Sequence, residues 1–262
     1  MATTSSSAWV LGASRGLGLA AARSLLQRGH TVTVSSRPGL RLDAAVEELA
    51  DLDLGAVDEL PLDLAEPGAI TAAIDTLRQR GPLPATIVMS SGGPTPGTAT
   101  EIGLDGLDRA YRSLLRPAYE LLQGAAPDLR AGGGGVVVYV TSSAVLEPIP
   151  NLAASNVMRS GVTALMQTAA RELAPDGIRV LCVAPGRIAT DRVAALDEAA
   201  ASRTSTTPEE VRARSESEIP MGRYGTPEEF GAVVGFLCSP EAAYMTGTTV
   251  LVDGGAIRGL LS

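Results

Sequence analysis

The sequence predicts one α/β domain in which seven parallel strands form a doubly wound sheet with helices on both faces. Short β-branched or aliphatic runs alternate with helical patterns along the chain, which is typical of βαβ units. The 262 residues are 45% hydrophobic but only 3% aromatic, which favours a closely packed core of Ala, Val, Leu and Ile. No internal repeat or linker divides the chain, so we expect residues 1–262 to form a single domain.

The first βαβ unit is the clearest. Residues 8–11 and 31–35 are the first two predicted strands. Between them, residues 17–27 repeat apolar side chains at helical spacing, and Gly29 lies just past the end of this pattern. The sequence therefore predicts a strand, a glycine-rich turn, a helix and a second strand.

The same rhythm predicts the later elements. The further strands are expected at residues 56–62, 86–89, 136–141, 178–183 and 248–252. Helices are expected at residues 42–52, 68–80, 104–126, 155–173 and 227–237, with Pro117 bending the helix at 104–126. Residues 187–217 show no strand pattern and lie between the sixth and seventh strands as an insertion would. Segments of this kind on rigid scaffolds often cover substrates, so we expect a substrate lid here.

Composition excludes several classes of function. The formal net charge is -8, which disfavours nucleic acid and anionic membranes as partners. Every basic residue in the printed sequence is an arginine, so Schiff-base and other lysine chemistry is excluded. One histidine, His30, and two cysteines, Cys182 and Cys238, are too few for a zinc site, and we expect no metal.

The same sequence bears on location. The longest uncharged stretch, residues 81–100, holds four prolines, so we expect no membrane-spanning helix. Residues 1–8 lack the basic region of a secretory leader. With two cysteines that show no pairing pattern, we expect a reducing cytoplasm.

A glycine-rich turn follows the first strand and precedes the first helix. Its glycines allow the backbone to approach a pyrophosphate, whose charge the free N–H groups and the dipole of a helix N-terminus stabilise. We interpret it as a dinucleotide-binding turn rather than a plain structural one, because of its place in a βαβ unit. The residues expected to contact the cofactor here are Gly12, Ser14, Arg15, Gly16, Leu17 and Gly18.

The end of the second strand bears on the choice of nicotinamide cofactor. An acidic side chain there would accept from a ribose hydroxyl and repel a 2′-phosphate, but the chain reads Ser35, Ser36 and Arg37. We expect Arg15 and Arg37 to hold the 2′-phosphate of NADP(H), with Ser36 beside them. The alternative is that both arginines are ordinary solvated side chains.

With this turn and the motifs that follow it, the chain resembles the short-chain dehydrogenase/reductase family, and is similar to its bacterial 3-oxoacyl-carrier-protein reductase-like members. The resemblance covers nearly the whole chain and rests on several motifs in order. They are GASRGLG at 12–18, the pair Asp63 and Leu64, SSGG at 90–93, TSS at 141–143, APG at 184–186 with Thr190, and GTTVLVDGG at 247–255.

The resemblance implies a Rossmann fold, a small-molecule substrate and a homotetramer built partly from residues 155–173. It also implies that Asp63 and Leu64 flank the adenine and that Ser90 and Gly92 lie beside the ribose. The residues that it places around the nicotinamide and the pyrophosphate are Pro185, Gly186, Ile188 and Thr190.

The chain departs from the family at the catalytic residues. Family members carry Asn, Ser, Tyr and Lys, the last two four residues apart on one helix. Alignment puts Ser155 and Arg159 in the places of Tyr and Lys, and Leu114 in the place of Asn. The serine is retained as Ser142, with Ser143 as the alternative if the loop differs by one residue.

These replacements have chemical consequences. A serine hydroxyl is a far weaker acid than a phenol, and an arginine holds its proton at neutral pH. Losing a positioned acid costs about 10² to 10⁴ in rate, which slows hydride transfer without forbidding it.

We predict an NADP(H)-dependent oxidoreductase acting on a carbonyl or alcohol with a rebuilt site. Ser142 would bond the substrate oxygen, Arg159 would hold the ribose and supply charge, and Ser155 would pass a proton with water. The alternatives are an isomerase or lyase that keeps the cofactor, and a catalytically silent nucleotide-binding subunit. We expect Tyr139, in the fifth strand, to pack against a helix rather than replace the missing phenol.

Overall fold

Seven strands form one parallel sheet in the computed structural model, which describes residues 6–259. The order is β3-β2-β1-β4-β5-β6-β7, and every neighbouring pair is parallel. The strands are β1 (Ser7–Leu11), β2 (Thr31–Ser35), β3 (Val57–Glu59), β4 (Thr86–Ser90), β5 (Gly135–Val140), β6 (Ile178–Pro185) and β7 (Thr249–Val252). The predicted fold class is confirmed, although β3 is shorter than the expected 56–62 because it forms the edge of the sheet, with a partner on one side only.

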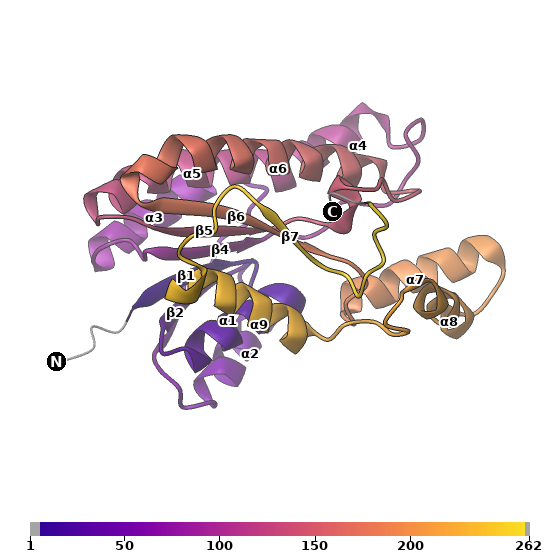
Figure 1. The fold of residues 1–262 in the computed structure, drawn as a ribbon, viewed down its shortest axis with the longest axis horizontal. Coiled ribbons are helices and arrows are strands. Elements are labelled where there is room, and N and C mark those ends of the chain that lie inside the picture. The colour runs from indigo at the N-terminus through magenta and orange to yellow at the C-terminus, as the bar shows by residue number, and fades with distance from the viewer. Residues whose placement is uncertain (1–5, 260–262) are drawn as a thin grey trace.

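Helices cover both faces of the sheet (Figure 1). One face packs against α1 (Gly16–Gln27), α2 (Leu40–Ala50) and α9 (Pro227–Cys238), and the other against α3 (Ala69–Arg80), α5 (Arg116–Ala131) and α6 (Ala153–Leu173). Alternate residues of a strand enter opposite cores, because side chains on a pleated strand point to alternate faces. In β1, Trp9 and Leu11 belong to one buried cluster and Ala8 and Val10 to the other.

The helix expected at 104–126 is two helices. The segment α4 (Gly103–Ala110) is followed by a one-turn π-helical stretch, Tyr111–Leu115, before α5 begins. Pro117 lies in the first turn of α5 rather than at a bend within one helix. Proline has no backbone N–H and its ring crowds the preceding turn, so the interruption falls just before it.

The segment at 187–217, for which no secondary structure was predicted, contains two helices. They are α7 (Asp191–Thr204) and α8 (Pro208–Glu218), which lie together at one end of the molecule (Figure 1). Thr190 and Thr207 cap them by accepting hydrogen bonds from the N–H groups of Val193 and Glu210. The helix α8 buries no residue, and α7 buries Asp197 and Ala201. Neither helix therefore has the apolar stripe by which hydrophobic periodicity predicts a helix. We name α7 and α8 the lid helices, after the substrate lid that the sequence predicts for residues 187–217.

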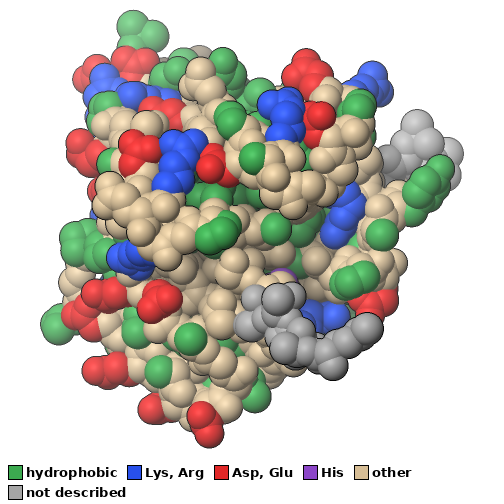
Figure 2. All heavy atoms as spheres, turned by 90° about the vertical axis from the view of Figure 1, so that its left-hand side faces the viewer, with side chains coloured by type: hydrophobic (Ala, Val, Ile, Leu, Met, Phe, Trp, Pro, Cys, Tyr) green, Lys and Arg blue, Asp and Glu red, His purple; other side chains and the backbone are tan. Residues whose placement is uncertain are grey.

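The order of the strands reverses at β1, which has β2 on one side and β4 on the other. Ligands of open α/β sheets bind in the crevice beyond the strand ends at such a point. The backbones there are close, since a β-carbon on Gly12, after β1, would stand 1.7 Å from the carbonyl oxygen of Ser90 in β4. The face of the molecule remote from the lid helices carries intermixed acidic and basic side chains (Figure 2).

Candidate functional site

The glycine turn after β1 has a backbone that other residues rarely adopt. Gly12 has a φ of +74° and Gly16 a φ of +55°, both in the left-handed region. A β-carbon on Gly18 would stand 2.2 Å from the carbonyl oxygen of Gly12, which no rotation of a side chain can relieve. The N–H of Gly12 donates to the carbonyl oxygen of Ser35 at 2.7 Å, which ties the turn to the end of β2.

The first turn of α1 is open to an anion. Arg15 occupies the N-cap position without a capping side-chain hydrogen bond, and the first turn holds no acidic residue. The first N–H groups of the helix therefore have no partner within it, and the helix dipole adds partial positive charge. Leu17 is half-buried and packs on the core beneath α1. This arrangement fits a pyrophosphate.

The tip of β2 carries hydroxyl groups and a cation. The Ser36 hydroxyl donates to the Ser14 hydroxyl at 2.9 Å, so the tip of β2 and the glycine turn are joined. Arg37 is exposed. Arg15 forms a salt bridge with Asp191 of α7 at 3.1 Å, and its side chain is 50% exposed. The structure thus directs Arg15 toward the lid helices, while Arg37 remains at the tip of β2.

The ends of β3 and β4 lie at the same edge of the sheet as the glycine turn, and the region beyond these strand ends, where open α/β sheets bind ligands, is called the crevice. The Asp63 carboxylate accepts from the N–H of Ala65 at 3.0 Å, which shapes the turn after β3. Leu64 packs against the hydrophobic core, and Ser90 ends β4. Gly92 is exposed, and its carbonyl oxygen accepts from Arg159 at 3.3 Å.

The loop after β6 approaches the glycine turn from the other side. Pro185 ends β6, and the N–H of Gly186 donates to Val252 at 3.0 Å. Ile188 is buried. A β-carbon placed on Gly16 would lie 3.5 Å from the methyl group of Thr190, so the N-terminus of α7 rests on the turn. The structure therefore brings the glycine turn, the end of β4 and the start of α7 to one crevice.

Two of the predicted catalytic serines lie on neighbouring elements. The Ser142 hydroxyl accepts from the N–H of Ala144 at 3.1 Å and begins the short 3₁₀ turn Ser143–Val145. Ser155 lies near the start of α6 and is buried, as is Ser143. The 3₁₀ turn packs against α6. Ser142 caps the turn and is half-buried, whereas Ser143 lies within the turn and is buried.

Arg159 is buried and bonded to the ends of two strands. The residue is only 7% exposed. Nη1 donates to the carbonyl oxygen of Val140 at 2.9 Å, and Nη2 donates to those of Ser91 and Gly92 at 3.2 and 3.3 Å. Burial lowers the pKa of the guanidinium. Since arginine has five N–H groups, three bonds leave two for a ligand.

Tyr139 lies in the core, as expected. Its hydroxyl donates to the carbonyl oxygen of Leu114 at 3.0 Å and lies 3.2 Å from the Ser91 hydroxyl. Leu114 belongs to the π-helical stretch, whose wider turn leaves a carbonyl for a side-chain donor. Burial raises the pKa of the Tyr139 phenol, so it is neutral. No sequence pattern predicts the link to Ser91, because it joins residues that only the fold brings together.

Arg192 also borders the site and was not among the predicted site residues. Its Nη2 atom donates to the carbonyl oxygen of Pro94 at 2.9 Å, in the loop after β4. The guanidinium lies against the backbone of Gly93, where a β-carbon would stand 2.8 Å from Nη2. Its pKa is lowered by burial and then by the charge of Arg15. Arg192 lies in the first turn of α7, and because that helix was not predicted, the sequence did not indicate that Arg192 reaches the loop after β4.

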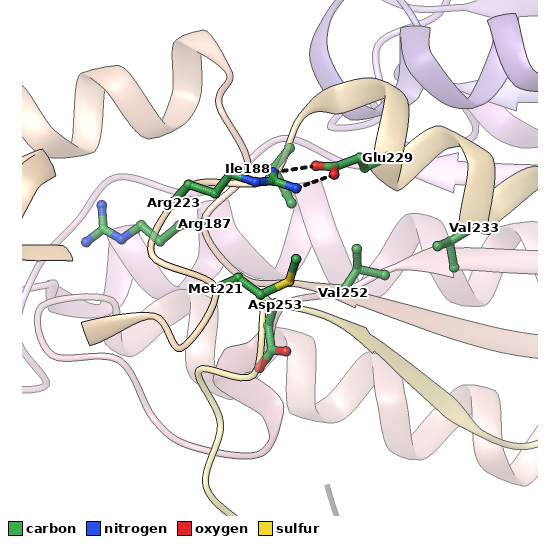
Figure 3. Close-up of a pocket in the computed structure, with 10 residues that line it drawn as sticks. Arg187, Ile188, Met221, Arg223, Glu229, Val233, Val252 and Asp253 are labelled. Carbon is green, nitrogen blue, oxygen red and sulfur yellow. Dashed lines mark hydrogen bonds and ion pairs between the residues drawn. The ribbon is translucent and has the colours of Figure 1, made fainter. Parts of the chain in front are cut away.

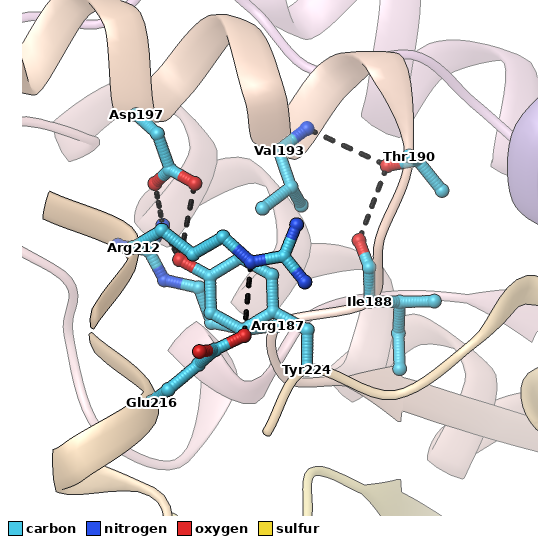
Figure 4. Close-up of polar contacts among 8 residues, drawn as sticks. All are labelled: Arg187, Ile188, Thr190, Val193, Asp197, Arg212, Glu216 and Tyr224. Carbon is cyan, nitrogen blue, oxygen red and sulfur yellow. Dashed lines mark hydrogen bonds and ion pairs between the residues drawn. The ribbon is translucent and has the colours of Figure 1, made fainter. Parts of the chain in front are cut away.

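The lid helices are joined to the loop after β6 by polar contacts (Figure 4). The buried Asp197 carboxylate pairs with Arg187 and accepts from the Tyr224 hydroxyl at 3.0 Å. The guanidinium of Arg212 lies 4.9 Å from the centre of the Tyr224 ring and pairs with Glu216 at 2.9 Å. These contacts hold α7 and α8 in one arrangement beside the crevice.

A separate cavity of about 190 Å³ lies between the start of α9, the end of β7 and the loop at 219–225 (Figure 3). Met221 and Val252 line it, and Arg223 pairs with Glu229 at its rim. Of the predicted site residues, Ile188 lines it. Ile188 is thus shared with the predicted cofactor site, whereas no residue of the glycine turn at 12–18 lines the cavity.

Residues 6–259 show neither a metal-ligand cluster nor a membrane-spanning helix. They contain no group of three or more His, Cys, Asp or Glu side chains that could hold a metal ion. None of the helices formed by these residues combines the length and the apolar character needed to cross a membrane.

Comparison with known proteins gives consistent matches. Residues 12–256 match the family model described as enoyl-(acyl carrier protein) reductase. The chain is 32% identical to dehydrogenase/reductase SDR family member 4 of Bos taurus, over 97% of this chain and 88% of that protein. It is 30% identical to L-rhamnose 1-dehydrogenase (NAD(P)(+)) of Sphingomonas, over 94% of each chain.

A solved structure matches with a TM-score of 0.92. It is L-sorbose reductase from Gluconobacter frateurii complexed with NADPH and L-sorbose, and it is 27% identical to this chain over 98% of both chains.

Proposed function

The chain belongs to the short-chain dehydrogenase/reductase family, and from this premise we propose that it is an NADP(H)-dependent oxidoreductase acting on a carbonyl or an alcohol. One observation carries the proposal. The left-handed glycine turn opens onto an uncapped helix N-terminus at the point where the strand order reverses. Such a place suits a dinucleotide.

The preference for NADP(H) rests on the tip of β2. It presents Ser36 and the exposed Arg37 where an acidic residue would repel a 2′-phosphate. The L-sorbose reductase neighbour was solved with NADPH, and the L-rhamnose dehydrogenase relative carries NAD(P)(+) in its name. The NADPH complex supports the preference, whereas NAD(P)(+) covers both nucleotides and supports a nicotinamide cofactor in general.

We assign the cofactor contacts to the residues that the crevice gathers. The adenine end would meet Asp63 and Leu64, and the nicotinamide end would meet the loop after β6. The full set is Gly12, Ser14, Arg15, Gly16, Leu17, Gly18, Ser36, Arg37, Asp63, Leu64, Ser90, Gly92, Arg159, Pro185, Gly186, Ile188 and Thr190.

The nicotinamide supplies or accepts a hydride when bound, and the protein must orient the substrate and manage a proton. Ser142 would donate to the substrate oxygen, and Ser155 would pass a proton with water. Arg159 would use its two remaining N–H groups to hold the ribose and stabilise developing negative charge. Because arginine keeps its proton, it orients without relaying.

The experiment is a turnover assay that follows NADPH with a panel of ketones and NADP⁺ with a panel of alcohols. We expect turnover in the wild type and a loss of about 10-fold or more in Ser155→Ala, since a positioned proton donor contributes at least that much. The matched control is Ser160→Ala, on the exposed side of the same helix. Cofactor binding without turnover of any compound would favour an isomerase, a lyase or a silent subunit.

A second pair of substitutions tests whether the site is rebuilt. The double variant Ser155→Tyr with Arg159→Lys restores the residues that the family carries. If it strongly raises ketone reduction, the native residues are not optimised for that reaction. If it lowers the rate, Ser155 and Arg159 are the working residues of this enzyme.

We also propose self-association into a homotetramer. Apolar side chains are exposed on neighbouring helices of one face: Leu104 on α4 is 81% exposed and Val157 on α6 is 58% exposed. Sedimentation velocity would give the number of subunits.

Both cysteines, Cys182 and Cys238, are free and buried, which agrees with a cytoplasmic location.

A further inference from the structure

Two arginines hold the loop after β4 from different helices. Arg159 of α6 donates to the carbonyl oxygens of Ser91 and Gly92, and Arg192 of α7 donates to that of Pro94. Gly93 lies between them and contacts the guanidinium of Arg192. The two cations therefore meet at one short loop on the border of the crevice.

Neither cation has an acidic partner. In residues 6–259, Arg159 and Arg192 form no salt bridge. The nearest acid in sequence, Asp191, is engaged by Arg15, and Asp197 is engaged by Arg187. A partly buried cation without an anion is unfavourable, because burial removes water and no carboxylate replaces it. This local excess of positive charge contrasts with the net charge of -8 for the whole chain.

The two arginines differ in what they have left to offer. Arg159 spends three hydrogen bonds on the strand ends, whereas Arg192 makes one, to Pro94. Arg192 therefore keeps more N–H donors for a ligand than Arg159 does. Arg192 lies two residues after Thr190, in the first turn of α7, and its side chain reaches the loop after β4.

We propose that Arg192 determines specificity by binding an anionic group, a carboxylate or a phosphate, on the carbonyl substrate. This rests on the proposed function. A planar guanidinium offers paired N–H groups that match such an anion. Gly93 leaves room for the guanidinium of Arg192, because any side chain at position 93 would displace it.

The competing role for Arg192 is to bind a phosphate group of the cofactor, as proposed for Arg15, whose charge contributes to the lowered pKa of Arg192. The test therefore measures the cofactor first. NADP⁺ is titrated by calorimetry into the wild type, Arg192→Gln, Gly93→Ala and the control Arg203→Gln. Arg203 is exposed near the end of α7 and forms no salt bridge within residues 6–259. Similar affinity in wild type and Arg192→Gln is expected.

Matched probes are then titrated into each NADP⁺ complex. The carboxylate arm compares 2-oxo, 3-oxo and 4-oxo acids with their methyl esters, and the phosphate arm compares dihydroxyacetone phosphate with dihydroxyacetone. We expect the charged member of at least one arm to bind about 10- to 100-fold more tightly, as a charge-assisted hydrogen bond allows. This ratio should vanish in Arg192→Gln, fall in Gly93→Ala and persist in Arg203→Gln.

Several results would overturn the inference. They are equal binding of charged and neutral probes, no binding of any charged probe, or a ratio unchanged in Arg192→Gln. A weaker affinity of Arg192→Gln for NADP⁺ itself, with the same probe ratio, would assign the residue to the cofactor. Failure of the wild type to bind NADP⁺ would instead remove the proposed function.

Discussion

The Nη2 atom of Arg159 donates a hydrogen bond to the carbonyl oxygen of Ser91, 3.2 Å away, although 68 positions separate the two residues. Together with the bond from Nη1 to Val140, this contact joins the carboxyl ends of β4 and β5 beneath the crevice. The residue that replaces the family's lysine is therefore also a structural tie between two strands. Its substitution should affect stability as well as chemistry.

Replacing Arg159 with Met should lower the free energy of unfolding by about 2 to 4 kcal/mol, because several backbone carbonyls lose a charged donor. Arg159→Lys should lose less, since an ammonium retains donors but lacks the fork of the guanidinium. Urea denaturation measures both. Arg171→Met, at an exposed position of the same helix, is the control. If Arg159→Met were as stable as Arg171→Met, the tie would be unimportant.

Gly18→Ala should destabilise the protein by about 2 to 4 kcal/mol, because the added methyl group meets backbone rather than a movable side chain. The contact is 2.2 Å, to the carbonyl oxygen of Gly12. In contrast, Gly106 lies within α4 and a β-carbon there would be 3.6 Å from its nearest neighbour. Gly106→Ala should stabilise by up to about 1 kcal/mol, the helix propensity difference. Equal effects at both sites, measured by denaturation, would contradict this explanation.

The fold was predictable because its strong signals are local. The strand at 31–35 and the helix that begins beside Gly16 follow from apolar periodicity and glycine position, and the structure has them within a residue or two. The helix α8 was missed because it buries nothing, so its sequence has no apolar stripe. The interruption expected at Pro117 lies in the preceding turn, Tyr111–Leu115, because the proline ring crowds the turn before it.

The site was predictable in part. Motifs identified the strand ends that meet at the crevice, because parallel strands bring their carboxyl ends to one edge of the sheet. Motifs do not reveal which backbone atoms a long side chain will reach. The bonds from Arg159 to two strand ends, and the position of Arg192 on Gly93, depend on tertiary geometry that no spacing encodes.

Acid should destabilise the protein through His30, the single histidine of the sequence. Burial, and then the charge of Arg28, lowers its pKa below the ordinary value of about 6.5 in the folded state. The unfolded state therefore binds the proton first, so stability falls as the pH drops through about 6.5 toward the folded pKa. Denaturation of wild type and His30→Gln between about pH 8 and about pH 5 checks this, and the variant should show a flatter profile. Identical profiles would exclude His30 as the cause.

The lid helices should loosen when Asp197 is replaced with Asn. The neutral amide keeps an acceptor oxygen but loses the ion pair with Arg187, so the contact between α7 and the loop after β6 is weakened. Trypsin cleavage after Arg203 should become about 5-fold faster or more, since local opening costs less without a charge-assisted bond. Glu198→Gln is the control, because its side chain is exposed on the same helix. An unchanged cleavage rate would show that other contacts hold the lid helices.

The central claim is that the glycine turn and the first turn of α1 bind a nicotinamide dinucleotide phosphate. Calorimetric titration of the folded wild type and of Arg37→Gln with NADPH and with NADH tests it most directly. The account predicts that the wild type prefers NADPH by about 10-fold or more and that Arg37→Gln loses most of this preference. A folded wild-type protein that releases no heat with either nucleotide would contradict it.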